Sequence, residues 1–130
     1  MMQQAEFDPL QFLRLADEIA TDDADEAALR TAIGRAYYAV FLLARKHTSV
    51  RGRHQAHHRV REELGGHSSR LAALLGTMAS YRDLADYDLQ PVNQQRQDWQ
   101  RNWRLVRKNA NEVLDELSKL LANTEQNEAL

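Results

Sequence analysis

The most constraining feature of the chain is an apolar repeat toward its C-terminal end. Apolar residues recur there at alternating steps of four and three, the spacing that places them on one side of an α-helix. A repeat of about six turns predicts one long helix packed along its length. Its members are Trp99, Trp103, Val106, Ala110, Val113, Leu117 and Leu120. A core position is the simplest explanation; an exposed aromatic stripe would instead mark an interface.

A second helix, expected from about residue 24 to residue 47, has apolar residues on two sides. One set keeps the same alternating spacing, and a second set widens it to another face. This predicts a central helix with neighbours on two sides. Gly34 inside it costs about 1 kcal/mol relative to alanine, which a close approach by another helix would explain. The two sets are Leu29, Ile33, Ala36, Val40 and Leu43, and Tyr37, Phe41 and Ala44.

Local start and stop signals predict three more helices. Asp8 and Pro9 begin the first, Gly65-Gly66 ends a short basic helix from His54 to Leu64, and Ser68 or Ser69 caps another that runs to about Tyr87. No run alternates as a strand does. We therefore predict an all-α fold: an up-and-down bundle of four to five helices, one domain over residues 1–123, and a frayed tail over residues 124–130.

Composition narrows the class of protein. A chain of 130 residues suits one domain. The absence of cysteine excludes disulfides and thiolate chemistry. No apolar run is long enough to cross a bilayer, and the first residues lack the basic and apolar regions of a signal peptide. We expect a cytoplasmic protein without membrane association.

Charges are segregated along the chain. Six acidic residues and no basic one lie between Asp17 and Glu26, whereas six basic residues and no acidic one lie between Arg45 and Arg61. A second basic stretch covers residues 101–108. Such blocks are typical of a phosphate-facing surface. A solvated loop and helix face, or contact between opposite blocks across a dimer, would explain them equally well.

Three histidines in the basic block have a spacing that can bind zinc. His54, His57 and His58 are at i, i+3 and i+4, but the His-Glu-x-x-His pattern is absent and no carboxylate lies nearby before Glu62. Arginines on both sides disfavour a cation, so we expect no metal and no cofactor. The alternatives are a basic face that gains charge below a pH of about 6.5, or one buried, hydrogen-bonded histidine.

Two further clusters are candidates for a site. Tyr37 and Tyr38 are about 100° apart on a helix, so one is expected in the core and the other beside a polar partner. Arg82 and Asp86 are at i, i+4 and can form an ion pair; Asp83 and Tyr87 share that spacing. This is either a surface network or a phosphate-binding arginine held by aspartate beside a phenol.

Together these residues resemble the HEPN superfamily, specifically its small stand-alone bacterial and archaeal members. The run from Arg35 to Phe41, Arg-Ala-Tyr-Tyr-Ala-Val-Phe, is similar to a Tyr-Tyr-Ala-x-Phe signature on that family's second helix. The run from Arg82 to Tyr87 resembles an Arg-x-x-Ala-Asp-Tyr ending on its fourth. His57 or His58 lies where such proteins often have a histidine. The resemblance covers roughly residues 8–122.

The resemblance implies a homodimer with the motif arginines facing across the two-fold axis, and a nucleotidyltransferase-like antitoxin as partner. Many members are metal-independent ribonucleases or toxins with an Arg-x(4–6)-His motif. In them arginine stabilises the phosphate, and histidine helps to transfer the proton as the 2′-hydroxyl attacks. Here Tyr87 stands where the shortest motif has histidine, and no histidine follows it. A phenol with a pKa of about 10 is a poor base at neutral pH.

We therefore expect a protein of toxin–antitoxin or defence type that binds RNA or a nucleotide, and a ribonuclease only in degenerate form. One alternative is a non-catalytic module that binds a nucleotide or a nucleotidyltransferase partner, with Tyr87 as acceptor of a nucleotidyl group. Another is a structural dimerisation unit. The candidate catalytic residues are Arg82, Asp83, Asp86 and Tyr87, and the candidate binding residues are Arg35, Tyr38, Arg51, Arg53, His57 and His58.

Overall fold

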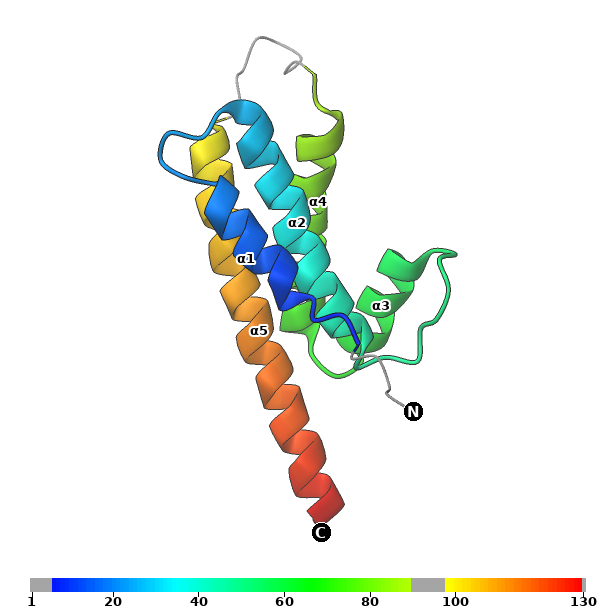
Figure 1. The fold of residues 1–130 in the computed structure, drawn as a ribbon. Helices are drawn as coiled ribbons and strands as arrows, with labels where there is room; N and C mark the ends of the chain where they lie inside the picture. Colours follow the sequence, from blue (N-terminus) through cyan, green and yellow to red (C-terminus); the bar gives the residue numbers. More distant parts are fainter. Residues whose placement is uncertain (1–5, 90–97, 130) are drawn as a thin grey trace, which may run out of the picture.

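The computed structural model describes residues 6–89 and 98–129, with side chains as far as residue 123. Within these ranges it contains helices and no strand, which confirms the predicted all-α bundle (Figure 1). The helices are α1 (Leu10–Ile19), α2 (Glu26–Arg45), α3 (Ala56–Gly65), α4 (Ser69–Tyr87) and α5 (Trp99–Ala129). The backbone of α5 is helical past residue 123, and fraying of this end stays a prediction.

Side-chain caps explain where three of the helices begin. The Asp8 carboxylate accepts a hydrogen bond from the Leu10 amide at 3.0 Å. Asp25 accepts from the Ala28 amide at 2.9 Å, so α2 begins slightly later than the sequence predicted. Ser68 accepts from the Leu71 amide at 3.1 Å, which selects it over Ser69 as the cap of α4. Each cap satisfies one of the amides that a helix start leaves unpaired.

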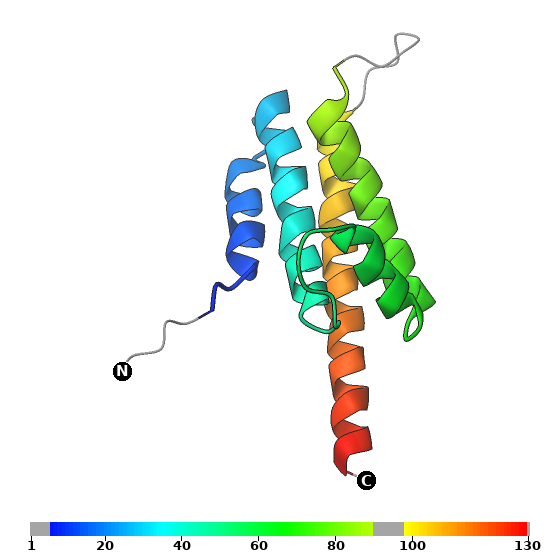
Figure 2. The same cartoon turned by 90° about the vertical axis from the view of Figure 1, so that its right-hand side faces the viewer.

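Helix α2 lies at the centre of the bundle. It packs on α1, α4 and α5, whereas α3 packs mainly on α4 and contacts α2 over a small area (Figures 1 and 2). Helices α1, α2, α4 and α5 run up and down beside one another, and the C-terminal part of α5 extends beyond the other three (Figure 2). This order agrees with the two apolar faces predicted for the second helix.

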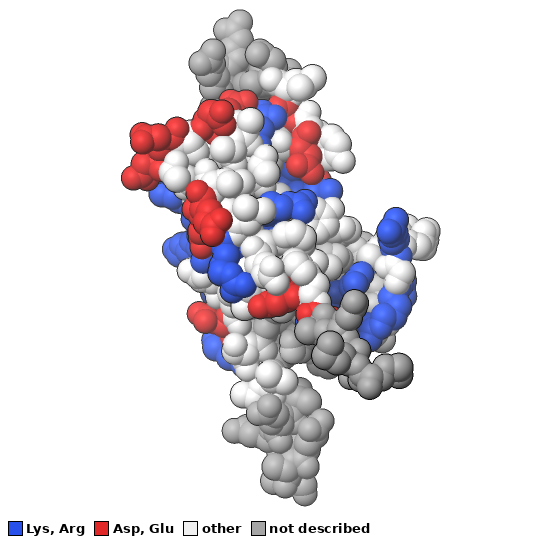
Figure 3. All heavy atoms as spheres, viewed as in Figure 1, with Lys and Arg blue, Asp and Glu red and all other residues white. Residues whose placement is uncertain are grey.

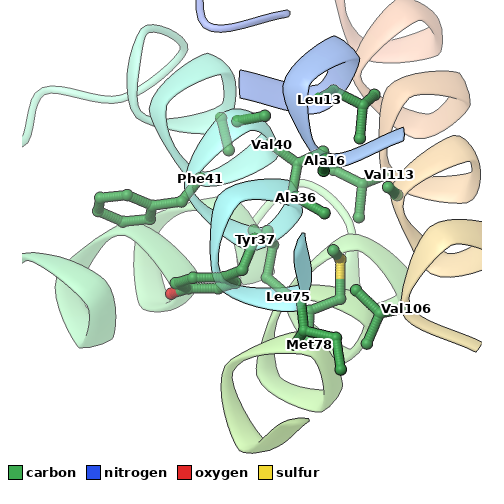
Figure 4. Packing of buried hydrophobic residues seen from close by; sticks show 14 of the residues in the cluster. Leu13, Ala16, Ala36, Tyr37, Val40, Phe41, Leu75, Met78, Val106 and Val113 are labelled. Carbon is green, nitrogen blue, oxygen red and sulfur yellow. The ribbon is translucent and has the colours of Figure 1, made fainter. Parts of the chain in front are cut away.

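All five helices contribute to one core. The tryptophan repeat of α5 is buried in it from Trp99 to Leu117, so the repeat is core and not an exposed stripe. Leu75, Met78 and Val106 lie close together on one side of α2, and Leu13, Ala16 and Val113 are grouped on another side (Figure 4). Burial of such side chains, at about 1.5–3 kcal/mol each, is the main stabilising contribution.

Polar contacts between the acidic and basic segments occur within the chain. Arg107 of α5 donates to both carboxylate oxygens of Asp17 on α1, at 2.7 and 3.2 Å. Carboxylates gather at the corner between α1 and α2, and basic side chains gather over α3 and the loop before it (Figure 3). The acidic block is thus partly matched by the second basic stretch, while the block from Arg45 to Arg61 faces solvent over much of its length.

Gly34 differs from its sequence-based interpretation. A Cβ atom added there would meet Asp86 Oδ1 at 3.9 Å, an ordinary van der Waals distance, and no backbone atom of another helix among its nearest neighbours. Close helix packing therefore does not require this glycine. No helix in the described part of the chain is long and apolar enough to cross a membrane.

Candidate functional site

The site is built around a hydrogen bond between α2 and α3. Tyr37 is 1% exposed, and its hydroxyl lies 2.6 Å from Nδ1 of His57. Burial raises the pKa of Tyr37 to about 12, so the phenol keeps its proton. Burial, followed by the nearby Arg82 and Arg61, lowers the pKa of His57 below 6.5, so the ring is neutral at pH 7. We assign the phenol as donor to Nδ1, because this direction uses the proton that the buried phenol retains, and Nε2 then carries the ring proton.

Aromatic side chains of α2 hold the His57 ring in place. The ring stacks on Phe41, with centroids 4.1 Å apart and planes inclined by 17°, and on Tyr37 at 5.5 Å. The edge of the ring meets Tyr38 at 6.0 Å. Tyr37 and Phe41 are at i, i+4, so one face of α2 supplies both stacking partners. His57 is thus the hydrogen-bonded histidine that the sequence left as one of two alternatives.

Arg82 of α4 lies on the other side of Tyr38. Its Nη2 donates to the Tyr38 hydroxyl at 3.1 Å, and its guanidinium carbon lies 5.3 Å from the centre of that ring. Two carboxylates neutralise it in part: Asp86 is 2.9 Å from Nε and Asp83 is 3.6 Å from Nη1. The Nε–H bond is not aligned with Asp86 as a hydrogen bond, so the pairing is mainly electrostatic.

A second guanidinium completes the cluster. Arg35 lies 5.0 Å from the centre of the Tyr38 ring and 5.0 Å from that of Phe12 on α1. Tyr38 is therefore in contact with two arginines and a neutral histidine. We refer to Arg35, Tyr38, His57, Arg82, Asp83 and Asp86 as the Tyr38 cluster. The donors of this cluster suit phosphate oxygens: the Tyr38 hydroxyl, the guanidinium N–H groups of the two arginines and Nε2–H of His57.

The structure brings six of the ten candidate residues into this cluster and puts four elsewhere. Tyr87 is 72% exposed and makes no hydrogen bond or ring contact with the described residues. His58 faces away from the cluster and lies 3.5 Å from Glu62. Arg51 donates to backbone carbonyls of its own loop, and Arg53 lies exposed in that loop.

Helix geometry accounts for the position of Tyr87. Arg82 and Asp86 are about 40° apart around α4, whereas Arg82 and Tyr87 are about 140° apart. The two ends of the Arg-x-x-Ala-Asp-Tyr segment therefore cannot both face Tyr38 on a regular helix. Because α3 begins at Ala56, His54 is outside the helix, and the three histidines do not share one helix face. No group of three metal-ligating side chains occurs in the described part of the chain.

The sequence did not identify Phe41 and Arg61 as parts of the site, and it left open which of Tyr37 and Tyr38 faces a polar partner. The i, i+4 pair of Tyr37 and Phe41 was visible as an aromatic face of α2, but its partner is separated by about twenty residues. Arg61 acts on His57 through charge, four residues further along α3. Comparison with protein-family models, with curated proteins and with solved structures gives no match for this chain.

Proposed function

We propose that the chain is a cytoplasmic HEPN-like protein of toxin–antitoxin or defence type that binds RNA or a nucleotide phosphate at the Tyr38 cluster. The observation that carries the proposal is the position of Arg82, held on the surface of α4 beside the Tyr38 hydroxyl and near a neutral His57. The resemblance of the Tyr-Tyr and Arg-x-x-Ala-Asp-Tyr segments supports the same conclusion.

The proposed binding mode follows from the donors in the cluster. A phosphate oxygen accepts from a guanidinium N–H of Arg82, and a second oxygen accepts from the Tyr38 hydroxyl. Asp86, on the Nε side, holds the guanidinium in its orientation. Arg35, 5.0 Å from the centre of the Tyr38 ring, adds a second positive charge. No metal ion takes part in this mode.

Binding is favoured over cleavage by the state of His57. Attack by an RNA 2′-hydroxyl needs a base that accepts its proton. With the tautomer assigned above, Nδ1 accepts from Tyr37, and Nε2 already carries a proton. His57 therefore suits donation to a phosphate better than base catalysis, so we propose that any ribonuclease activity is weak.

Affinity measurements with matched arginine variants test the proposal. We expect Arg82→Ala to weaken binding of a labelled RNA by about tenfold or more, because a charge-assisted contact is lost. Arg104→Ala, which removes an exposed arginine of α5 that has no ion pair within the described residues, should bind as the wild type does. Equal weakening by both variants, or by neither, would refute this site.

Incubation with total RNA separates binding from cleavage. Degradation that disappears in both Arg82→Ala and His57→Gln would assign a ribonuclease to the cluster. Degradation that is unchanged in both variants would come from another source. The expected result is intact RNA with the wild-type protein.

A second candidate, a module that binds a nucleotidyltransferase partner, is favoured by the exposure of Tyr87. Its phenol oxygen could attack the α-phosphate of a nucleoside triphosphate, with release of pyrophosphate and loss of the phenol proton. Incubation with such a partner and ATP should then add one nucleotidyl mass to the wild type and none to Tyr87→Phe. The half-buried Tyr81 supplies the control variant, Tyr81→Phe.

We also propose a homodimer, on the basis of the resemblance. The α5 repeat is buried within one chain, so a dimer would use other surfaces. Light scattering at micromolar concentration tests this point, and a monomer would exclude a site shared between two copies. A dimer that binds no nucleotide, RNA or partner would leave the structural dimerisation unit.

A further inference from the structure

A second basic site lies between the start of α1 and the end of α2. A hollow of ≈ 610 Å³ occurs there, next to the loop that leads to α3. Its lining combines three cations, one carboxylate and apolar side chains: Arg45, Lys46, Arg51, Glu6, Phe7, Pro9 and Leu42. The hollow therefore has a surplus of positive charge and a partly apolar wall.

The cations of this hollow are available to an anion. The Arg45 guanidinium has no ion pair or hydrogen bond with the described residues. Arg51 is oriented by hydrogen bonds from Nη1 to the carbonyl oxygens of Thr48 and Val50, at 3.0 and 2.9 Å. Its other N–H groups have no acceptor among the residues that the structure describes. Lys46 lies 3.3 Å from Glu6, whose side chain is 80% exposed. The exposed Glu6 carboxylate thus occupies the position beside Lys46 that a phosphate of a ligand would take in its place.

A continuous row of contacts joins the hollow to the Tyr38 cluster. Phe7, which is 48% exposed, lies 5.0 Å from Phe12. Phe12 in turn contacts Arg35, and Arg35 contacts Tyr38, each at 5.0 Å. Along α2, Leu42 and Arg45 follow Tyr38 at i+4 and i+7, so they lie on the same side of the helix. Arg45 is about 10 Å from Tyr38 along the helix axis.

We infer that the hollow is a second anion-binding site, and that it takes another phosphate of the strand bound at the Tyr38 cluster. Aromatic rings interleaved with cations along a surface are the features with which proteins bind single-stranded nucleic acid. A nucleoside monophosphate carries one phosphate and cannot fill both anion sites, whereas a strand of a few nucleotides can. The inference rests on the proposed function and specifies its ligand as single-stranded nucleic acid.

A length series with matched variants tests the inference. Affinity of the full chain should rise from a mononucleotide to a strand of about eight nucleotides. The Arg45→Ala, Arg51→Ala double variant should weaken the longer strand about tenfold and leave the mononucleotide unchanged. It should also reduce the steepness of the salt dependence: the negative slope of log affinity against log salt should become smaller in magnitude by about one to two. Arg104→Ala is the control for loss of surface charge.

The possible outcomes separate this inference from the proposed function. Affinity that does not depend on length, or that the double variant does not change, would overturn the second site and leave the first intact. Equal affinity for a duplex of the same length would overturn the single-strand assignment. If Arg82→Ala also left all affinities unchanged, the proposed function itself would fail. Unfolding curves of each variant identify any loss of affinity that comes from misfolding. Arg45→Lys, which keeps the positive charge, should bind the longer strand as the wild type does.

Discussion

The Tyr37 hydroxyl donates to Nδ1 of His57 at 2.6 Å and so joins α2 to α3 where these helices otherwise have little contact. The bond orients the imidazole and leaves Nε2 without a hydrogen-bond partner among the described residues. It also positions α3, whose main packing is on α4. One hydrogen bond therefore serves both the fold and the candidate site.

Removal of the Tyr37 hydroxyl should destabilise the protein. We expect Tyr37→Phe to lower the free energy of unfolding by about 1–2 kcal/mol, because the half-buried Nδ1 loses its donor. Urea denaturation measures the change. Tyr38→Phe, which loses a hydrogen bond at a more exposed position, should cost less. Equal stability of Tyr37→Phe and the wild type would mean that water replaces the phenol without cost.

His57 should also make stability depend on pH. Its pKa in the folded protein is below 6.5, first because of burial and then because of Arg82 and Arg61. In the unfolded chain the pKa of His57 has its ordinary value of about 6.5. At pH values between the folded and the unfolded pKa, the unfolded chain binds more protons than the folded one, so stability rises with pH. Acidification from about pH 7.5 to about pH 5.5 should therefore cost the wild type stability.

His57→Gln isolates this contribution. The other histidines, His47, His54, His58 and His67, are exposed and remain in both proteins. The loss of unfolding free energy on acidification should thus be smaller in His57→Gln than in the wild type. If both proteins lost the same amount, His57 would titrate as an ordinary exposed histidine.

The helices could be predicted from the sequence because their signals are local. The alternating repeat of α5 and the caps Asp8 and Ser68 depend on residues within one or two turns. The start of α3 was missed by about two residues: Gln55 adopts φ of 49°, a left-handed conformation, which delays the helix to Ala56.

The site was less predictable because it depends on contacts between helices. The sequence assigned Arg82 and Tyr87 to one cluster by their resemblance to a motif, and helix periodicity alone separates them by about 140°. The pairing of Tyr37 with His57 required the packing of α3 on α4, which no local pattern encodes. The charge block near Arg45 was visible, but its connection to Tyr38 through Phe7 and Phe12 was not.

Gly34 supplies a test of the space beside the Tyr38 cluster. Gly34→Ala should raise the free energy of unfolding by up to about 1 kcal/mol, because alanine favours the helix and its Cβ meets only Asp86 Oδ1 at 3.9 Å. RNA affinity should stay unchanged, since the proposed contacts lie on the other edge of the Arg82 guanidinium. Urea denaturation measures the change. A lower free energy of unfolding in Gly34→Ala would show that α2 and α4 are packed more tightly here than the contact distance indicates.

The last prediction concerns the carboxylates around Arg82. Asp83 lies 3.6 Å from Nη1 with a side chain that is 66% exposed, so it reduces the positive charge without fixing the guanidinium. Asp83→Asn should tighten phosphate binding about two- to fivefold, the equivalent of about 0.5–1 kcal/mol for an exposed ion pair. Asp86→Asn should tighten it less, or weaken it, because Asp86 lies closer to the guanidinium, 2.9 Å from Nε, and orients it.

The same variants give a readout that does not depend on a ligand. The charge of Asp83 raises the pKa of His57. Its removal should therefore move the His57 titration in an NMR experiment to lower pH. Weaker binding by Asp83→Asn, with the His57 titration shifted as expected, would mean that the carboxylate positions Arg82 for the phosphate. In that case Arg82 would bind its ligand only as part of the ion-pair network with both aspartates.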